Sequence, residues 1–419
     1  MMPSPEQIKK SLFALTAKGI KYDLDRIRAA AKQIGNPHDS YPSIHVAGTN
    51  GKGSTCAFIE RILRSAGYST GLFTSPHIVR FEERFRINGK PVKESEWVDS
   101  YFQVKEIVEA CQLTFFEATM LMAGVLFKQH QIDYGIFETG LGGRLDATNI
   151  LHPIVTVVTN IALDHADYLG STLIEVAREK LGIVKKGVPL VAAEPSVRNI
   201  RDEMLVTCKE KCSECTFVNS SGAGYVFNSE TGVADFLHEG MSYSMKMAGE
   251  YQVINAKCAI EAVHRCGEKI SENVIRKGIG ETTLRCRFDK YVIGDKTFIF
   301  DVAHNPDAVE QLCITLKKTF PSEKICFVTG IMKDKNFSAM LSEYDKIALH
   351  IICTKPSTER AASAELLFAA LKSDKKSKCS DIGTAIASVK KRPEKIICVT
   401  GSFYTVGEAL TFLQLDPAG

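Results

Sequence analysis

The chain has 419 residues, of which 45% are hydrophobic and 24% charged, and its formal net charge is +3. These values are typical of a globular protein, and the length favours two or three domains. The weak net charge and the lack of dense Lys/Arg blocks argue against a nucleic-acid partner. No segment reads as an export signal or a membrane span, so the sequence predicts a cytoplasmic protein.

The 13 cysteines are scattered without a disulfide framework and are expected to be mostly buried thiols. One group, Cys208, Cys212 and Cys215, could begin a zinc site. No fourth ligand follows at a suitable spacing, and Cys208 and Cys212 are four residues apart on a charged, helix-like stretch. We therefore favour a surface or half-buried helix here.

Taken in chain order, apolar residues at helical spacing predict a helix over 24–34, which Gly35 ends. A short strand is predicted over 43–47, followed by a glycine-rich turn over 48–55 and an amphipathic helix over 56–66. The same signals predict further strands over 68–73, 134–139, 154–160 and 188–192, and helices over 117–130 and 173–182. Strands that alternate with helices are typical of a parallel sheet covered on both faces.

After residue 215 the pattern changes. Short antiparallel strands are predicted over 215–244, a helix over 255–265, and a second series of strands over 297–301, 325–329 and 396–400. We place a boundary between about residues 280 and 290, which gives domains 1–282 and 288–419 and a linker of about 283–287. The predicted fold class is α/β: a P-loop-type, mostly parallel sheet in an N-terminal ATPase domain, and a smaller Rossmann-like C-terminal domain.

The segment from Gly48 to Thr55, GTNGKGST, lies between a predicted strand and a helix. Glycines let backbone amides surround phosphate oxygens, and the helix N-terminus adds partial positive charge. Lys52 would supply a cation, and either Ser54 or Thr55 a hydroxyl near Mg²⁺. The strict Walker spacing is not met, because Gly53 follows Lys52 and Val46 holds the first glycine position. A glycine turn without a ligand is the alternative; the flanking elements favour nucleotide binding.

Loops after four predicted strands carry Lys52, Ser75, Glu138 and His165, and Lys180 lies on the next helix. Taken singly, Glu138 is best explained as a solvated acid, His165 as a loop histidine, and Lys180 as a surface lysine. The carboxyl ends of parallel strands share one crevice, however, so these side chains are expected to converge there. Hard oxygen ligands among them suit Mg²⁺.

Six segments occur in a recognisable order: GTNGKGS, FTSPH, ETGLGGRLDATN, NIALDHADYLG with REK, DVAHNP and GSFYTV. Together they resemble the bacterial dihydrofolate synthase/folylpolyglutamate synthase family, which belongs to the Mur ligase superfamily. The resemblance extends from about Gly19 to the C-terminal helix. It implies an ATP-dependent ligase that joins L-glutamate to dihydropteroate and to folates through an acyl phosphate.

The resemblance also implies roles for individual residues. The ATP site would comprise Gly48, Thr49, Asn50, Gly51, Lys52, Gly53, Ser54, Thr55, Asn255, Arg287 and Asp301. Two Mg²⁺ ions, with K⁺ as a further candidate, would be held by Ser54, Ser75, Glu138, His165 and Lys180, the last as a carbamate. Catalysis would involve Lys52, His165, Lys180, Asp301 and His304.

The substrates, dihydropteroate or folate and L-glutamate, are implied to contact Asp23, Phe116, Arg144, His304 and Ser402. Asp23 belongs to the segment KYDLDR, which resembles the pterin-side stretch of bifunctional members; Phe116 could equally be a core aromatic. Two departures occur. The linker reads Arg285-Cys286-Arg287 where the family has Pro-Gly-Arg, so the ATP-contacting arginine is either of the two. Gly-Glu-Tyr-Gln at 249–252 replaces Gly-x-His-Gln.

Three alternatives stay open at this point. The chain could be a folylpolyglutamate synthase only, a Mur-type amino-acid ligase, or a non-catalytic nucleotide-binding module. A cell-wall Mur ligase usually carries an additional N-terminal domain, for which the residues before Gly48 are too few. We expect a monomer that acts on small molecules.

Overall fold

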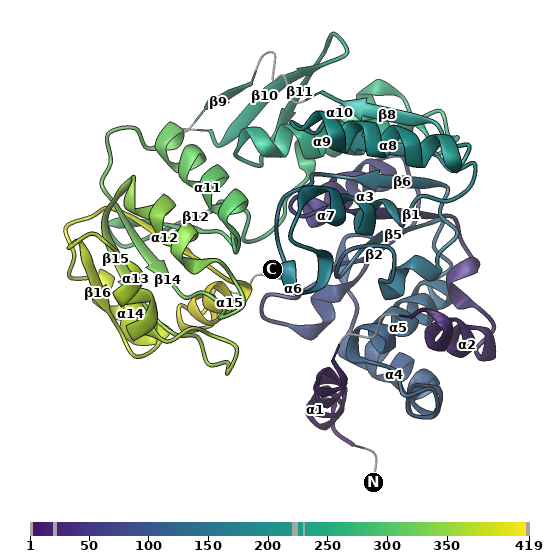
Figure 1. Cartoon of the computed structure of the whole chain (residues 1–419), viewed down its shortest axis with the longest axis horizontal. Coiled ribbons are helices and arrows are strands. Elements are labelled where there is room, and N and C mark those ends of the chain that lie inside the picture. Colours follow the sequence, from purple (N-terminus) through teal and green to yellow (C-terminus); the bar gives the residue numbers. More distant parts are fainter. Residues whose placement is uncertain (1–2, 20–22, 220–224, 229–230, 416–419) are drawn as a thin grey trace.

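The computed structural model describes residues 3–19, 23–219, 225–228 and 231–415. Figure 1 shows two lobes side by side: the elements from α1 to α10 form the first, and those from β12 to α15 form the second. No helix in the described part of the chain is both long and apolar enough to cross a membrane.

An eight-stranded sheet forms the centre of the first lobe, in the order β4-β3-β2-β5-β1-β6-β7-β8. The six strands from β2 to β8 in that order run parallel, and β3 and β4 are antiparallel. Their bounds are β1 Ser43–Ala47, β2 Thr70–Phe73, β3 Phe85–Ile87, β4 Lys90–Pro91, β5 Tyr134–Glu138, β6 Val155–Val158, β7 Leu190–Ala193 and β8 Cys215–Val218. The central strands are buried on both faces, as is usual for parallel sheets.

Helices cover both faces because neighbouring strand residues point to opposite sides. Val157 and Val191 pack toward α3, α9 and α10, whereas Val158 and Leu190 pack toward α7 and α8. Phe137 contributes to the core beneath α1, α2, α4 and α5. The helices are α1 Pro5–Ala14, α2 Asp25–Gln33, α3 Lys52–Ser65, α4 Glu94–Ala110, α5 Phe115–Gln129, α6 Ala166–Leu169, α7 Leu173–Leu181, α8 Arg198–Glu210, α9 Glu250–His264 and α10 Glu272–Glu281. Short 3₁₀ helices lie at Leu15–Lys18, Pro37–Asp39, Phe81–Arg84 and Ala147–Ile150.

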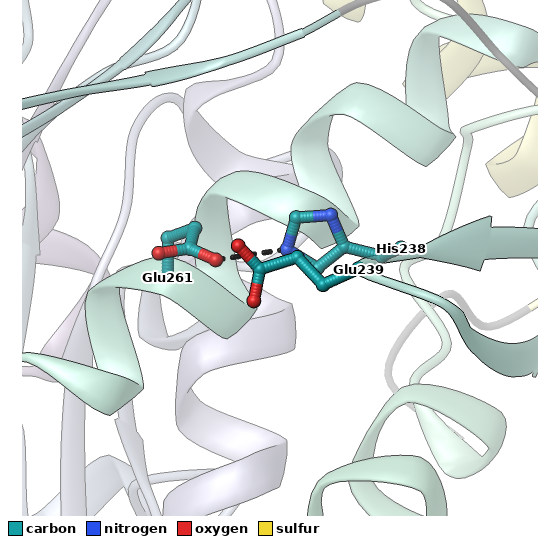
Figure 2. Close-up of side chains that lie close together, drawn as sticks. All are labelled: His238, Glu239 and Glu261. Carbon is teal, nitrogen blue, oxygen red and sulfur yellow. Dashed lines mark hydrogen bonds and ion pairs between the residues drawn. The ribbon is translucent and has the colours of Figure 1, made fainter.

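A small antiparallel sheet of β9 (Val226–Asn228), β10 (Val233–His238) and β11 (Met241–Met245) covers α9 and α10. His238 tethers this sheet to α9, because its Nε2 lies 2.9 Å from Oε1 of Glu261 (Figure 2). The other carboxylate oxygen of Glu261 binds Arg265.

The second lobe contains a six-stranded sheet in the order β12-β13-β17-β14-β15-β16, parallel except for β12. Its strands are β12 Asp289–Ile293, β13 Lys296–Phe300, β14 Ile325–Thr329, β15 Ala348–Cys353, β16 Lys376–Lys378 and β17 Ile396–Thr400. The helices α11 Pro306–Thr319, α12 Phe337–Asp345 and α13 Ala364–Ala370 cover one face, and α14 Ile382–Val389 and α15 Phe403–Phe412 the other. The predicted pair of mostly parallel α/β sheets is confirmed.

Some local predictions were wrong. The strand at 215–218 is not part of an antiparallel group; it extends the main sheet parallel to β7. The helix expected over 255–265 begins at Glu250, and the one expected from Cys56 begins at Lys52. Cys212 lies beyond the end of α8 with φ of 50°, so it does not share a helix with Cys208.

Candidate active site

A cleft with about 700 Å³ of empty space lies between the two lobes. The first lobe lines it with the loops that follow β1, β2, β5 and β6, since the ends of parallel strands meet at one edge of a sheet. The predicted site residues that the structure brings together here are Gly48, Thr49, Asn50, Gly51, Lys52, Gly53, Ser75, Glu138, His165, Lys180, Arg287 and His304. The expected convergence of strand-end loops is therefore observed.

Two glycines shape the loop between β1 and α3. Gly48 has φ of 147°, and a Cβ there would overlap Oγ1 of Thr159; Gly51 has φ of 87° and lies against Oδ1 of Asn255. Lys52, the first residue of α3, donates from Nζ to the carbonyl oxygens of Gly48 at 3.0 Å and Thr49 at 3.1 Å. The backbone thus surrounds the ammonium group at a helix N-terminus, a geometry suited to a phosphate.

Neither candidate hydroxyl on α3 lines the cleft. Ser54 and Thr55 are buried in the first turn, and the Thr55 hydroxyl lies 3.4 Å from the carbonyl oxygen of Asn255. Asn255 itself packs beneath the loop, with its amide donating to Gln252. All three support the loop from below rather than facing the cavity.

Glu138 ends β5 and is buried. Its Oε2 accepts a hydrogen bond from the backbone amide of Ser75 at 3.1 Å. Burial raises the pKa of the Glu138 carboxyl, while Lys52 and the Ser75 amide partly offset this effect. A carboxylate held beside a lysine and a loop amide can ligate a hard cation.

Lys180 on α7 is also buried, and its Nζ donates to the carbonyl oxygen of Gly48 at 2.9 Å. Burial and the nearby Lys52 lower the pKa of Lys180 to about 7. Two lysines therefore share one carbonyl oxygen, and at neutral pH a substantial fraction of Lys180 is the uncharged amine.

Asp164 and Lys335 belong to the site but were missed from the sequence. Lys335, in the loop after β14, lies 2.6 Å from Oδ1 of Asp164 and 3.1 Å from Nε2 of His165. Burial raises the pKa of Asp164, but Lys335, His165 and His304 together hold it well below its usual value. Asp164 adjoins His165 in a motif already singled out, whereas nothing in the sequence pointed to Lys335.

His304 reaches the same cluster from the second lobe. Its Nδ1 lies 2.9 Å from the carbonyl oxygen of Val302, so Nδ1 carries the proton and Nε2 has the free lone pair. Burial and Lys335 lower the pKa of His304 to about 4. Burial likewise lowers the pKa of His165. Both imidazoles are therefore neutral at pH 7.

Asn50 and Asn305 connect the phosphate loop to the second lobe. The Asn305 amide donates to Oδ1 of Asn50 at 2.9 Å and to Asp164 at 3.1 Å, and Asn50 donates to Asp307 at 2.8 Å. Asn305 also caps α11, since its Oδ1 accepts from the Ala308 amide. These contacts were not anticipated, although Asn305 lies within DVAHNP.

Asp301 and Ser402 do not line the cleft. The Asp301 carboxylate accepts from the backbone amides of Phe288 and Ala303, and burial raises its pKa to about 6. Ser402 caps α15, and its hydroxyl donates to the carbonyl oxygen of Gly330. Both residues brace loops behind the cavity instead of pointing into it.

The two linker arginines have different surroundings. Arg287 lines the cleft and lies over the ring of Phe403. Arg285 forms an ion pair with Asp289 at 2.9 Å and borders a separate cavity. The geometry favours Arg287 as the arginine that could contact a nucleotide.

The residues expected on the pterin side are dispersed around the cleft. The ring of Phe116, at the start of α5, packs on Gly140, which lines the cleft. Arg144 is exposed and pairs with Glu179 at 2.7 Å. Asp23 is 3.8 Å from Arg26 and partly exposed; Lys21 and Tyr22 of the same segment lie outside the described residues.

In the described part of the chain, Cys208, Cys212 and Cys215 do not form a three-ligand group. His238, Glu239 and Glu261 do, with candidate ligand atoms within 4.8 Å of one another (Figure 2). There the Glu261 carboxylate is already bound by His238 and Arg265, which explains its burial without an ion.

Comparison with known proteins shows to which family the chain belongs. Residues 46–263 match the Mur ligase middle domain, and residues 286–403 match the Mur ligase glutamate ligase domain. The chain is 34% identical to the dihydrofolate synthase/folylpolyglutamate synthase of Bacillus subtilis, over 93% of this chain and 94% of that protein. The chain belongs to the dihydrofolate synthase/folylpolyglutamate synthase family.

Further members of this family are similar to the chain in sequence and in structure. The Escherichia coli dihydrofolate synthase/folylpolyglutamate synthase is 33% identical over 97% of this chain and 94% of its own. A structure of E. coli FolC in complex with DHPP and ADP superposes with a TM-score of 0.88, at 32% identity and with 99% of both chains covered. Mycobacterium tuberculosis folylpolyglutamate synthase complexed with ADP gives a TM-score of 0.91, at 27% identity and with 99% of both chains covered.

Proposed function

We propose that this protein is an ATP-dependent ligase that joins L-glutamate to dihydropteroate and extends folates with further glutamates. One observation carries the proposal: Lys52, Glu138, His165 and Lys180 face Arg287 and His304 across a single cleft. The likeness to dihydrofolate synthase/folylpolyglutamate synthases over nearly the whole chain supports the same reaction.

ATP would bind with its phosphates on the loop from Gly48 to Thr55. Lys52 would exchange its two backbone carbonyl partners for phosphate oxygens, and Arg287 would contact the nucleotide from the linker between the lobes. Asn255 and Asp301 would act indirectly, since one packs beneath Gly51 and the other holds the Phe288 amide.

A divalent ion fits the oxygen-rich corner beside Glu138. The buried carboxylate and the Ser75 loop offer the hard donors that Mg²⁺ prefers, whereas Ser54, which is buried outside the cleft, would have to turn toward it to act as a ligand. When bound, such an ion would neutralise charge on the transferring phosphoryl group. A crystal structure of a related bifunctional enzyme contains Mn, AMPPNP and L-glutamate, which supports a divalent metal here.

A second divalent ion would lie near His165 and Lys180. An ammonium group cannot ligate a cation, but the lowered pKa of Lys180, about 7, provides the free amine that reacts with carbon dioxide to form a carbamate. His165 would have to release Lys335 to become a ligand. K⁺ is a further candidate for this region.

The carboxylate of dihydropteroate or folate would attack the γ-phosphate of ATP to give an acyl phosphate and ADP, and the amino group of glutamate would then attack the acyl carbon, releasing phosphate. The neutral imidazole of His304 presents a free Nε2 that can accept the proton lost by the amino group. Closure of the second lobe would exclude water from the hydrolysable intermediate.

The acceptor would lie near Phe116, with Asp23 and Arg144 at its outer end, and glutamate near His304. Ser402 would position the loop on the glutamate side through its bond to Gly330. We also propose domains 1–282 and 288–419 joined by residues 283–287, a monomeric state and a cytoplasmic location.

Phosphate release distinguishes the candidate functions. Purified protein with ATP and Mg²⁺ is assayed with dihydropteroate, tetrahydrofolate or a UDP-linked cell-wall precursor, each with and without L-glutamate. We expect release with either pteridine only when glutamate is present, and none in a Lys52→Met control. Activity with tetrahydrofolate alone would indicate a monofunctional folylpolyglutamate synthase, and activity with the precursor would indicate a Mur-type ligase.

A further inference from the structure

A second cavity, with about 710 Å³ of empty space, lies on the α3 side of the main sheet, away from Phe116 and α5. One wall is the C-terminal half of α3, and another is the hairpin formed by β3 and β4. The third wall is the segment from Glu281 to Arg285, which leads from α10 into the second lobe. None of the residues assigned above to catalysis lines it.

Positive charge exceeds negative charge in this cavity. Its lining contains four arginines and two glutamates: Arg61, Arg64, Arg86, Arg285, Glu60 and Glu281. Within it Arg64 pairs with Glu60 at 3.0 Å and Arg61 pairs with Glu281, while Arg285 pairs with Asp289, which lies outside the lining. Three of the four arginines are therefore paired, and among the described residues Arg86 is the one in this lining without a direct carboxylate partner.

Arg86 and Arg61 have unused donors. Arg86 is half-buried, and in the described part of the chain its guanidinium makes no direct hydrogen bond or ion pair; burial lowers its pKa, and the nearby charges of Glu83 and Glu60 partly offset this effect. The Nε of Arg61 is buried without an acceptor, and Arg64 lowers the pKa of Arg61 further. A buried donor without a partner, such as the Nε of Arg61, is costly. A ligand that supplies anionic oxygens to this donor and to the Arg86 guanidinium would stabilise the site.

The cavity wall is adapted to hold guanidinium groups close to the backbone. A Cβ at Gly89, in the β3–β4 turn, would come within 2.6 Å of Nη2 of Arg64, and Gly89 has φ of 78°. Glycine at this position therefore leaves room for the Arg64 guanidinium against the hairpin.

We propose that this cavity binds a small polyanion that carries phosphate or carboxylate groups. Arginine forks recognise both groups through paired N–H donors. The proposal goes beyond the ligase reaction and does not depend on it. Because Glu281 and Arg285 border the cavity, a bound anion would contact the chain segment that connects the lobes, and would compete with Glu281 for Arg61.

Isothermal titration of the full-length protein with sodium pyrophosphate and with sodium citrate, in low-chloride buffer, tests this. A non-hydrolysable ATP analogue is present to fill the catalytic cleft, and Mg²⁺ is left out because pyrophosphate and citrate both chelate it. We expect saturable 1:1 binding of at least one anion. Pyrophosphate alone would indicate a phosphate ligand and citrate alone a carboxylate ligand.

Arg86→Met removes the unpaired charge without breaking an ion pair, and should weaken binding at least about tenfold. Arg86→Lys should retain part of the affinity, and Arg198→Met, which alters an exposed arginine on α8, should bind like the wild type. Circular dichroism checks that each variant is folded.

The absence of saturable binding to either anion would overturn the proposal. So would equal affinity of Arg86→Met and wild type. Binding that is lost in Lys52→Met but kept in Arg86→Met would assign the anion to the catalytic cleft instead, and would also overturn it.

Discussion

The Nζ of Lys335 lies 2.6 Å from Oδ1 of Asp164, although 171 residues separate the two in sequence. Both side chains are only 7% exposed. A buried ion pair therefore joins the two lobes at the edge of the cleft, directly beside His165 and His304.

Lys335→Met should separate the lobes and reduce ligation at least about tenfold. Removing one partner of a buried pair leaves an uncompensated charge, which costs about 3–5 kcal/mol. Small-angle scattering should show a larger radius of gyration, and phosphate release should fall. Lys333→Met is the matched control, because the Lys333 side chain donates to the Glu359 carbonyl at an exposed position. Unchanged scattering and activity in Lys335→Met would contradict this assignment.

Asn305→Asp should open the cleft while leaving α11 capped. An aspartate keeps the acceptor for the Ala308 amide but loses both donations, to Asn50 and to Asp164, and adds a negative charge beside Asp164 and Asp307. We expect slower ligation, a larger radius of gyration and a lower thermal unfolding midpoint, because Asn305 is only 1% exposed and the new carboxylate would lie beside two others. Asn305→Ala adds no charge but removes the cap, which costs ~1 kcal/mol.

The comparison for this prediction is Asn336→Asp, which alters the cap residue of the neighbouring helix α12 at an exposed position. It should leave both scattering and activity unchanged. If it produced the same opening as Asn305→Asp, added negative charge in general, rather than the lost contacts, would be responsible.

Lys180 should make stability depend on pH in bicarbonate-free buffer. Its pKa is about 7 in the folded protein against 10.5 for the unperturbed side chain. The unfolded chain therefore binds more protons between these values, so the unfolding free energy rises with pH by up to about 1.4 kcal/mol per unit in this window. Below pH 7 the folded lysine is protonated as well, and the dependence ends.

Denaturant titrations at pH 7 and pH 9.5 measure this effect. Lys180→Met should be more stable than wild type at pH 7, and the difference should shrink at pH 9.5. Lys186→Met, at an exposed position, is the control and should show no such change. A pH-independent difference between Lys180→Met and wild type would rule out the buried charge as its source.

Gly140→Ala should raise the KM for dihydropteroate more than the KM for ATP, provided that Phe116 borders the acceptor. The added Cβ would lie 2.6 Å from the Phe116 ring, which must then move. Steady-state kinetics with each substrate varied in turn measures both constants. A larger effect on ATP would show that Phe116 serves the nucleotide side of the cleft.

The part of the site that lies in the first lobe could be predicted, because it depends on local sequence patterns. Alternation of strands and helices located the loop from Gly48 and the acid at Glu138, and parallel pairing guarantees that such strand ends share one edge. β8 was misassigned because four residues with mixed polarity do not reveal whether the strand pairs with β7 or with the hairpin that follows.

The contacts between the lobes could not be predicted in this way. Lys335 and Asn305 contact Asp164 and Asn50 across two different sheets, and the periodicity of neither segment predicts such a contact. The motifs also did not reveal where a side chain points. Ser402 and Asp301 lie in segments that match the family, but their side-chain oxygens bind backbone groups behind the cleft.

Lys52 donates to the carbonyl oxygens of Gly48 and Thr49, so the phosphate loop contains its own cation, which helps to hold its shape. When a triphosphate binds, the Lys52 ammonium group would exchange carbonyl oxygens for phosphate oxygens, and the loop would not have to become ordered. Such an exchange has a small entropic penalty, and the carbonyl of Gly48 would keep Lys180 as its remaining donor throughout.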